Sequence, residues 1–179
     1  NFRKVKRVED VIMTFERLRK EIDAKLLMIG DGPERSKAEA LCREHDLCDD
    51  IVFLGNQNPV EEIYSIGDLF LMPSASESFG LSALEAMSCG VPVVSSNAGG
   101  LPEINLHGHT GFVYDIGDVD NMGKGAVEIL QDDDRWAEFS RNARQNAEQY
   151  QLDNIVPHYE SYYEKVLARV PGNLTAPQP

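Results

Sequence analysis

Five short apolar runs alternate with segments of helical periodicity, and this alternation restricts the possible folds more than any other feature of the sequence. Each run is apolar through its centre, which is typical of strands that are buried on both faces. The predicted strands cover residues 25–30, 51–55, 69–73, 92–95 and 111–114. Because short connections between strand and helix require parallel strands and right-handed crossovers, we predict an α/β fold with a doubly wound, Rossmann-like parallel sheet.

Helical patterns fill the spaces between these strands and follow the last of them. The predicted helices cover residues 8–18, 34–45, 60–64, 81–89, 121–131, 135–149 and 155–167. We expect one domain over residues 1–168 and a flexible, turn-rich tail over residues 169–179. Ligands of doubly wound sheets bind outside the carboxyl ends of the strands, so the residues that directly follow each strand are the first candidates for function.

The charge and the cysteines exclude several classes of protein. A net charge of -13 repels phosphate backbones, so we expect no nucleic-acid partner, although seven basic side chains gather in residues 1–20. No apolar run reaches the length of a membrane span, so we expect none. The cysteines match neither a disulfide framework nor a zinc ligand set, and we expect reduced thiols, no metal site and a cytoplasmic location. They are Cys42, Cys48 and Cys89.

The segment after the third predicted strand carries the clearest functional signal. Gly80 lets the backbone approach a ligand, and the helix that begins there directs free N–H groups outward, as phosphate-binding sites do. Glu77 precedes this helix and Glu85 lies one turn inside it, where carboxylates can accept hydrogen bonds from sugar hydroxyls. The alternative is that both glutamates are solvated charges at a helix end.

The segment ESFGLSALEAMSCGVPVVSSNAGGLPEI resembles the E-x7-E region of glycosyltransferase family 4, which has the GT-B architecture. LLMIGDGPE, IVFLGNQN and HGHTGFVYDIGD resemble further family motifs in the same order, so the similarity extends to about residue 167. The resemblance implies that the chain is the C-terminal, donor-binding half of a GT-B enzyme. It also implies that the N-terminal acceptor domain lies outside this sequence and that this chain alone is inactive.

The resemblance assigns roles to individual residues. Glu85 would bind the ribose hydroxyls, Glu77 would contact the donor sugar, and Lys6 would bind the diphosphate. Family members usually carry an Arg where this chain has Asn1, so Arg3 would supply the second positive charge. The remaining donor-binding candidates fall into three groups. The backbone amides of Ser78, Phe79, Gly80 and Leu81 would hold the diphosphate or the sugar. Asn56 or Gln57 would contact the base, and Gly30 and Gly32 would keep the floor of the cleft open.

The activity implied is a retaining, metal-independent hexosyl transfer from a UDP-sugar, with no cofactor. The opening segment FRKVKRVEDVI resembles the bacillithiol-pathway branch of the family, which implies UDP-N-acetylglucosamine as donor and L-malate as acceptor. Two alternatives remain: a transferase that acts on another acceptor, such as a cell-envelope glycan, and a non-catalytic nucleotide-binding or interaction domain.

In the resembled fold, a central strand leads into the segment at Phe2, and most of that strand lies outside this sequence. We therefore expect a sheet that does not close within this chain. Such a chain would be unstable alone, or would borrow a strand and form a homo-oligomer.

Overall fold

The computed structural model describes residues 1–169. It divides the chain into two compact units, Asn1–Ala147 and Glu148–Pro179. The domain predicted over residues 1–168 therefore extends past the boundary between these units. The predicted tail falls outside the described residues, except for Arg169, which ends the last helix.

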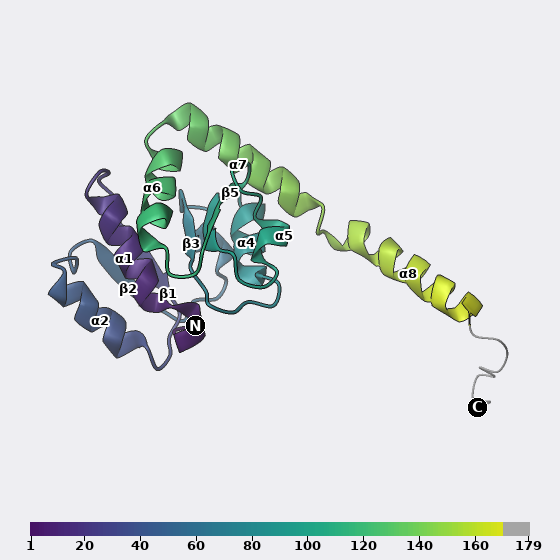
Figure 1. Cartoon of the computed structure of the whole chain (residues 1–179), viewed down its shortest axis with the longest axis horizontal. Helices are drawn as coiled ribbons and strands as arrows, with labels where there is room; N and C mark the ends of the chain where they lie inside the picture. Colours follow the sequence, from purple (N-terminus) through teal and green to yellow (C-terminus); the bar gives the residue numbers. More distant parts are fainter. Residues whose placement is uncertain (170–179) are drawn as a thin grey trace. The chain divides into compact units, whose positions relative to one another are not determined.

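The first unit contains all five predicted strands, and every pairing among them is parallel (Figure 1). β1 pairs with β2, and β4 lies between β3 and β5. Within the second group, Val93 is opposite both Phe70 and Gly111. The bounds are Leu26–Ile29 for β1, Ile51–Gly55 for β2, Phe70–Met72 for β3, Val93–Ser96 for β4 and Gly111–Tyr114 for β5. The predicted α/β class with parallel strands is confirmed.

The strands form two separate sheets, because β1 and β3 are not paired with each other. A cavity of about 1170 Å³ is lined by the whole of β1 and the whole of β3. Within residues 1–169, β1 pairs only with β2 and β3 pairs only with β4, so the edge of each strand that faces the cavity has no strand partner. The sheet does not close within the described chain, as the sequence predicted.

The helices follow the predicted order with two additions. The predicted ones are α1 (Val8–Arg19), α2 (Arg35–Glu44), α3 (Glu61–Tyr64), α4 (Leu81–Ser88), α6 (Val119–Leu130), α7 (Asp133–Glu148) and α8 (Leu152–Arg169). The additions are the 3₁₀ turn η1 (Lys4–Lys6) and the single-turn helix α5 (Leu101–Ile104). Both additions are short, and α5 carries a proline in its first turn, so neither displays a helical period in the sequence.

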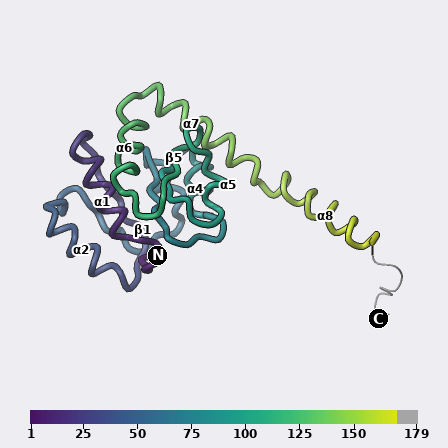
Figure 2. Tube along the Cα trace, in the orientation of Figure 1, coloured from purple at the N-terminus to yellow at the C-terminus, as the bar shows by residue number. Residues whose placement is uncertain are grey.

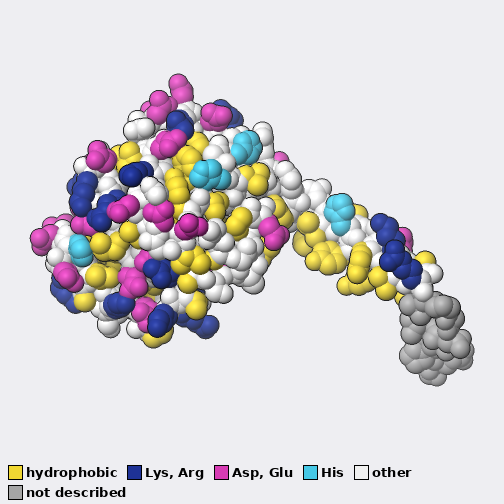
Figure 3. Space-filling model, viewed as in Figure 1, with side chains coloured by type: hydrophobic (Ala, Val, Ile, Leu, Met, Phe, Trp, Pro, Cys, Tyr) yellow, Lys and Arg dark blue, Asp and Glu magenta, His cyan; other side chains and the backbone are white. Residues whose placement is uncertain are grey.

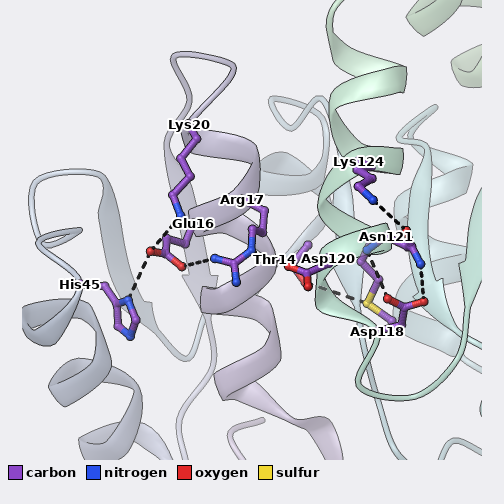
Figure 4. Close-up of polar contacts among 10 residues, drawn as sticks. Thr14, Glu16, Arg17, Lys20, His45, Asp118, Asp120, Asn121 and Lys124 are labelled. Carbon is purple, nitrogen blue, oxygen red and sulfur yellow. Dashed lines mark hydrogen bonds and ion pairs between the residues drawn. The ribbon is translucent and has the colours of Figure 1, made fainter.

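Helices α1 and α6 lie side by side (Figure 2). Gly123 allows this close approach, because a Cβ at that position would lie 2.4 Å from the Cβ of Arg17. Polar side chains interact at the edge of this helix–helix interface. Arg17 Nε donates to Asp120 at 2.6 Å, and Arg17 also forms an ion pair with Glu16 (Figure 4). Beneath them Phe15 is 1% exposed, and burying a side chain of that size contributes about 1.5–3 kcal/mol.

A buried asparagine joins β4, β5 and α5. Asn105 is 1% exposed, and its amide nitrogen donates to the carbonyl oxygens of Val93 and Phe112 and to the hydroxyl of Ser95. Its amide oxygen accepts from Thr110 Oγ1 at 2.9 Å. Since an unpaired buried amide is costly, this fully bonded side chain fixes where α5 lies relative to the ends of two strands.

The second unit is described over a single helix, α8, with its preceding turn. Large apolar and aromatic side chains are exposed along this helix (Figure 3). They are Leu152, Val156, Tyr159, Tyr162, Tyr163, Val166 and Leu167. None of the three tyrosines is buried within the described residues.

Candidate functional site

The segment from Phe2 to Val5 crosses the carboxyl ends of both sheets. The amide of Phe2 donates to the carbonyl of Asp31, just after β1, at 2.9 Å. The amide of Ala75, just after β3, donates to the carbonyl of Val5 at 2.8 Å. This segment therefore brings Lys6 to the edge of the sheets at which doubly wound folds bind their ligands.

Lys6 forms an ion pair and hydrogen bond with Glu77, which lies in the loop after β3. The side chain of Lys6 is 30% exposed and that of Glu77 is 13% exposed, so the contact is partly shielded from water. These two residues are 71 positions apart in the sequence, and the structure brings them into direct contact. The lysine keeps enough exposure to reach an arriving anion.

Two arginines lie near Lys6 in the sequence, and their surroundings differ. Arg3 is exposed. Arg7 donates to Asp10 at 3.0 Å, and this side-chain hydrogen bond raises the pKa of Arg7. Arg7 is thus committed to the first turn of α1, whereas Arg3 extends into solvent beside the Lys6 turn.

Gly80 precedes helix α4 with φ of 96°, in the left-handed region that favours glycine. A Cβ there would lie 2.7 Å from Leu101 and 3.0 Å from Ile104, two side chains that are fully buried. No side chain caps the amino end of α4, so its first amides are free of a capping group. Gly80 thus sets the helix closely against α5 and presents amides that suit an anion.

Two adjacent glycines, Gly99 and Gly100, pack against the Glu77 loop, and the sequence analysis assigned these glycines no role. A Cβ at Gly99 would lie 1.7 Å from the carbonyl oxygen of Glu77, and one at Gly100 would lie 2.7 Å from that of Ser78. The amide of Gly100 also donates to the carbonyl of Glu77 at 3.4 Å. The adjacent glycines of NAGG were the available signal, because paired glycines after a strand often permit close backbone approach.

Glu85 is exposed on α4 and lies close enough to Tyr64 to act on its charge state. The pKa of Tyr64 is raised, first by burial and then by the Glu85 carboxylate, while a hydrogen bond with Ser82 opposes the rise. Tyr64 therefore stays a neutral phenol that can donate a hydrogen bond near Glu85. The sequence predicted a short helix over residues 60–64 but gave Tyr64 no functional role.

The cavity between the sheets opens onto these groups. Among the predicted site residues, Lys6, Gly30, Asn56, Gln57 and Glu85 line it. Arg3, Gly32, Glu77 and the four residues Ser78, Phe79, Gly80 and Leu81 do not, although Glu77 is held at its rim through Lys6. The amide of Gln57 donates to the carbonyl of Leu54 at 2.6 Å, so this side chain folds back on its own turn.

Gly30 and Gly32 serve a purpose that the sequence did not suggest. A Cβ at Gly32 would lie 2.6 Å from the carbonyl oxygen of Phe2, and one at Gly30 would lie 3.3 Å from the backbone nitrogen of Asn1. Both glycines therefore make room for the segment that carries Lys6.

Over residues 1–169 no group of three or more His, Cys, Asp or Glu side chains is arranged to hold a metal ion. No helix in that range is long and apolar enough to cross a membrane.

A family model described as "Glycosyl transferases group 1" matches residues 1–148. The chain belongs to this family. That match covers the two sheets, the Lys6 turn and the Glu77 loop, so the geometry described above is that of a group 1 glycosyl transferase domain.

Two curated relatives and one solved structure illustrate the similarity. N-acetyl-alpha-D-glucosaminyl L-malate synthase of Bacillus anthracis is 42% identical over 93% of this chain and 44% of its own length. Sulfoquinovosyl transferase SQD2 of Arabidopsis thaliana is 37% identical over 72% of this chain and 25% of its own length. Sucrose-phosphate synthase of Thermosynechococcus elongatus superposes with a TM-score of 0.83 at 26% identity, over 94% of this chain and 44% of that chain.

The structural neighbours are GT-B glycosyltransferases, and the fold agrees with a Rossmann-like half of that architecture. The chain spans less than half the length of the curated relatives described above.

Proposed function

We propose that this chain binds the nucleotide-sugar donor of a retaining, family 4 glycosyltransferase, and that the donor is UDP-N-acetylglucosamine. The observation that carries the proposal is the Lys6–Glu77 pair, which the fold holds at the rim of a cavity that Glu85 also lines. A cation and two carboxylates at one edge match the two ends of such a donor, since a diphosphate needs positive charge and sugar hydroxyls need acceptors.

The proposed reaction breaks the bond between the anomeric carbon and the diphosphate oxygen. The diphosphate oxygen gains negative charge as this bond breaks, the acceptor oxygen bonds to the same face of the sugar, and the proton of the acceptor hydroxyl passes to the leaving diphosphate. Lys6, Arg3 and the backbone amides of Phe79 to Leu81, at and just before the amino end of α4, would stabilise that charge without a metal ion. Glu77 would exchange its contact with Lys6 for donor-sugar hydroxyls, while Glu85 would bind the ribose with Tyr64 beside it.

The acceptor proposed is L-malate, because the synthase of Bacillus anthracis, whose name contains L-malate, is 42% identical over most of this chain. Relatives whose names contain other compounds, among them a D-inositol 3-phosphate glycosyltransferase, make a different acceptor the alternative. The acceptor-binding part would lie outside this sequence, so we expect donor binding, and no turnover, from this chain alone. We expect the enzyme to act in the cytoplasm.

Thermal unfolding with added nucleotides tests the donor site. A ligand at 100 times its dissociation constant stabilises the folded state by about 2.7 kcal/mol, which raises the midpoint by roughly 5–10 °C for a chain of this size. We expect that shift with UDP and not with ADP or GDP at equal concentration. Glu85→Ala should abolish it, whereas Glu138→Ala, at an exposed position within helix α7, should preserve it.

The outcomes separate the parts of the proposal. Equal shifts with all three nucleotides would refute the uridine assignment but keep a diphosphate site. An unchanged UDP shift in Glu85→Ala would refute the ribose role. Absence of any shift in a chain that unfolds cooperatively would refute donor binding by this half.

A further inference from the structure

Two cysteines lie against each other at the end of helix α2. Cys42 occupies the last turn of the helix and is 3% exposed, whereas Cys48 lies in the following turn and is exposed. Their sulfur atoms are 3.2 Å apart. The sequence gave no reason to pair them, because their spacing fits no disulfide framework.

The backbone between them holds this arrangement. Asp46 adopts a left-handed conformation with φ of 55°, which reverses the chain after α2. The amide of Leu47 then donates to the carbonyl of Cys42 at 2.9 Å, and the buried Leu47 side chain anchors the turn in the core. The two sulfurs approach each other because the turn directs them together, and a disulfide of about 2.05 Å requires a further approach of only about 1 Å.

We infer that Cys42 and Cys48 form a reversible intramolecular disulfide when the protein meets a low-molecular-weight disulfide. The Cys48 thiolate attacks one sulfur of the reagent, forms a mixed disulfide and releases one thiolate. Cys42 then loses its proton to solvent, attacks the sulfur of Cys48 and releases the second thiolate. Two protein thiols are oxidised to one disulfide, and the reagent is reduced to two thiols, each of which takes up a proton.

The order of these steps follows from exposure. Cys48 is accessible to a reagent, whereas the surrounding core shields Cys42. Burial, followed by the hydrogen bond with Cys48, raises the pKa of Cys42 to about 12, so Cys42 is a poor first nucleophile. Cys89, which is partly exposed and contacts the carbonyl of Glu61 at 3.9 Å, has no sulfur neighbour among the described residues and serves as an internal comparison.

The bridge would fasten the end of α2 to the turn that enters β2. Neither cysteine lines the cavity between the sheets, so we expect nucleotide binding to be unaffected. Closing a short loop restricts the unfolded chain, and we expect the oxidised protein to unfold roughly 5 °C higher than the reduced protein.

The test exposes the reduced, folded chain to oxidised glutathione, blocks the remaining thiols with an alkylating agent, and maps the peptides by mass spectrometry. Trypsin cuts after Arg43, between the two cysteines, and a glutamate-specific protease separates Cys48 from Cys89. We expect peptides containing Cys42 and Cys48 to be joined, with the loss of two hydrogens, and to separate after reduction. Cys89→Ser should leave this linkage intact.

Two single variants distinguish a directed pair from general oxidation. Cys42→Ala should retain glutathione on Cys48, because the resolving thiol is gone. Cys48→Ser should leave Cys42 alkylated only after unfolding, because burial protects it. Glutathione that persists on Cys48 in the wild-type chain, or a linkage that forms only in denaturant, would overturn the inference.

Discussion

Replacing Gly99 by alanine should uncouple the loop that carries Glu77. At Gly99 the backbone has φ of 53°, and the added Cβ would lie 1.7 Å from the carbonyl oxygen of Glu77. The left-handed conformation costs an alanine about 1–2 kcal/mol. Relieving the contact requires a backbone carbonyl to move, and such overpacking adds about 1–3 kcal/mol. We therefore expect Gly99→Ala to lower the free energy of unfolding by about 2–5 kcal/mol.

Gly108→Ala is the matched control, because Gly108 has φ of 75° and no atom within 4 Å of the added Cβ. It should lose only the backbone contribution of about 1–2 kcal/mol. Urea unfolding of both variants measures the difference. Gly99→Ala should also weaken UDP binding at least about tenfold, because moving Glu77 disturbs its pair with Lys6, whereas Gly108→Ala should bind normally. Equal losses of stability, together with equal UDP affinity, would refute this reasoning.

Three other substitutions test contacts elsewhere in the first unit. Lys6→Met should destabilise the protein by about 1–3 kcal/mol, because it leaves Glu77 partly buried and unpaired. In a double-mutant cycle with Glu77→Gln in urea, a coupling below about 0.5 kcal/mol would argue against the pair. Asn105→Ala should cost about 2–4 kcal/mol in the same assay, since buried partners lose their hydrogen bonds; a loss under about 1 kcal/mol would show that α5 is held by other contacts. For Glu16, burial favours a higher pKa, but hydrogen bonds from Lys20 and His45 outweigh it and lower the pKa below the usual 4.5. A carboxyl group with a lowered pKa in the folded state stabilises the protein above its unfolded-state pKa, and this stability is lost as the pH falls. Thermal midpoints should therefore drop less steeply below pH 4.5 in Glu16→Gln than in the wild type. Parallel curves of midpoint against pH would contradict this.

The strands could be predicted because each is a short apolar run with a turn signal on either side. Helices of two turns or more were equally visible through their period. In the structure, Asp118 caps α6 by accepting a hydrogen bond from the amide of Asn121 at 3.3 Å. Helix α5 could not be predicted, because four residues that include a proline carry no period. The position of α5 is fixed by Asn105, which donates hydrogen bonds to carbonyl oxygens on β4 and β5. No local sequence pattern reveals these partners.

The candidate site shows the same division. Glu77, Gly80 and Glu85 stand out because they surround one strand-to-helix turn, where the chemistry of the residues is local. The resemblance assigned Lys6 and Glu77 separate roles in one donor site, and their direct contact, which depends on a segment that crosses two sheets, comes from the structure alone. The roles of Gly99 and of Tyr64 were missed because each acts on a neighbour that is distant in sequence. The site roles themselves remain predictions.

The separation of the two sheets also determines which parts of the backbone are protected from solvent. β4 has a hydrogen-bonded neighbour on each side, so its amides should be the slowest of all the strands in hydrogen exchange. β1 and β3 each bond to one neighbour only, and their amides that face the cavity should exchange rapidly. An edge of this kind accepts a strand from any chain that offers one, so raising the concentration of this chain should slow exchange in β1 and β3 before it changes β4. The concentration at which that protection appears would report how strongly a borrowed strand binds between the two sheets.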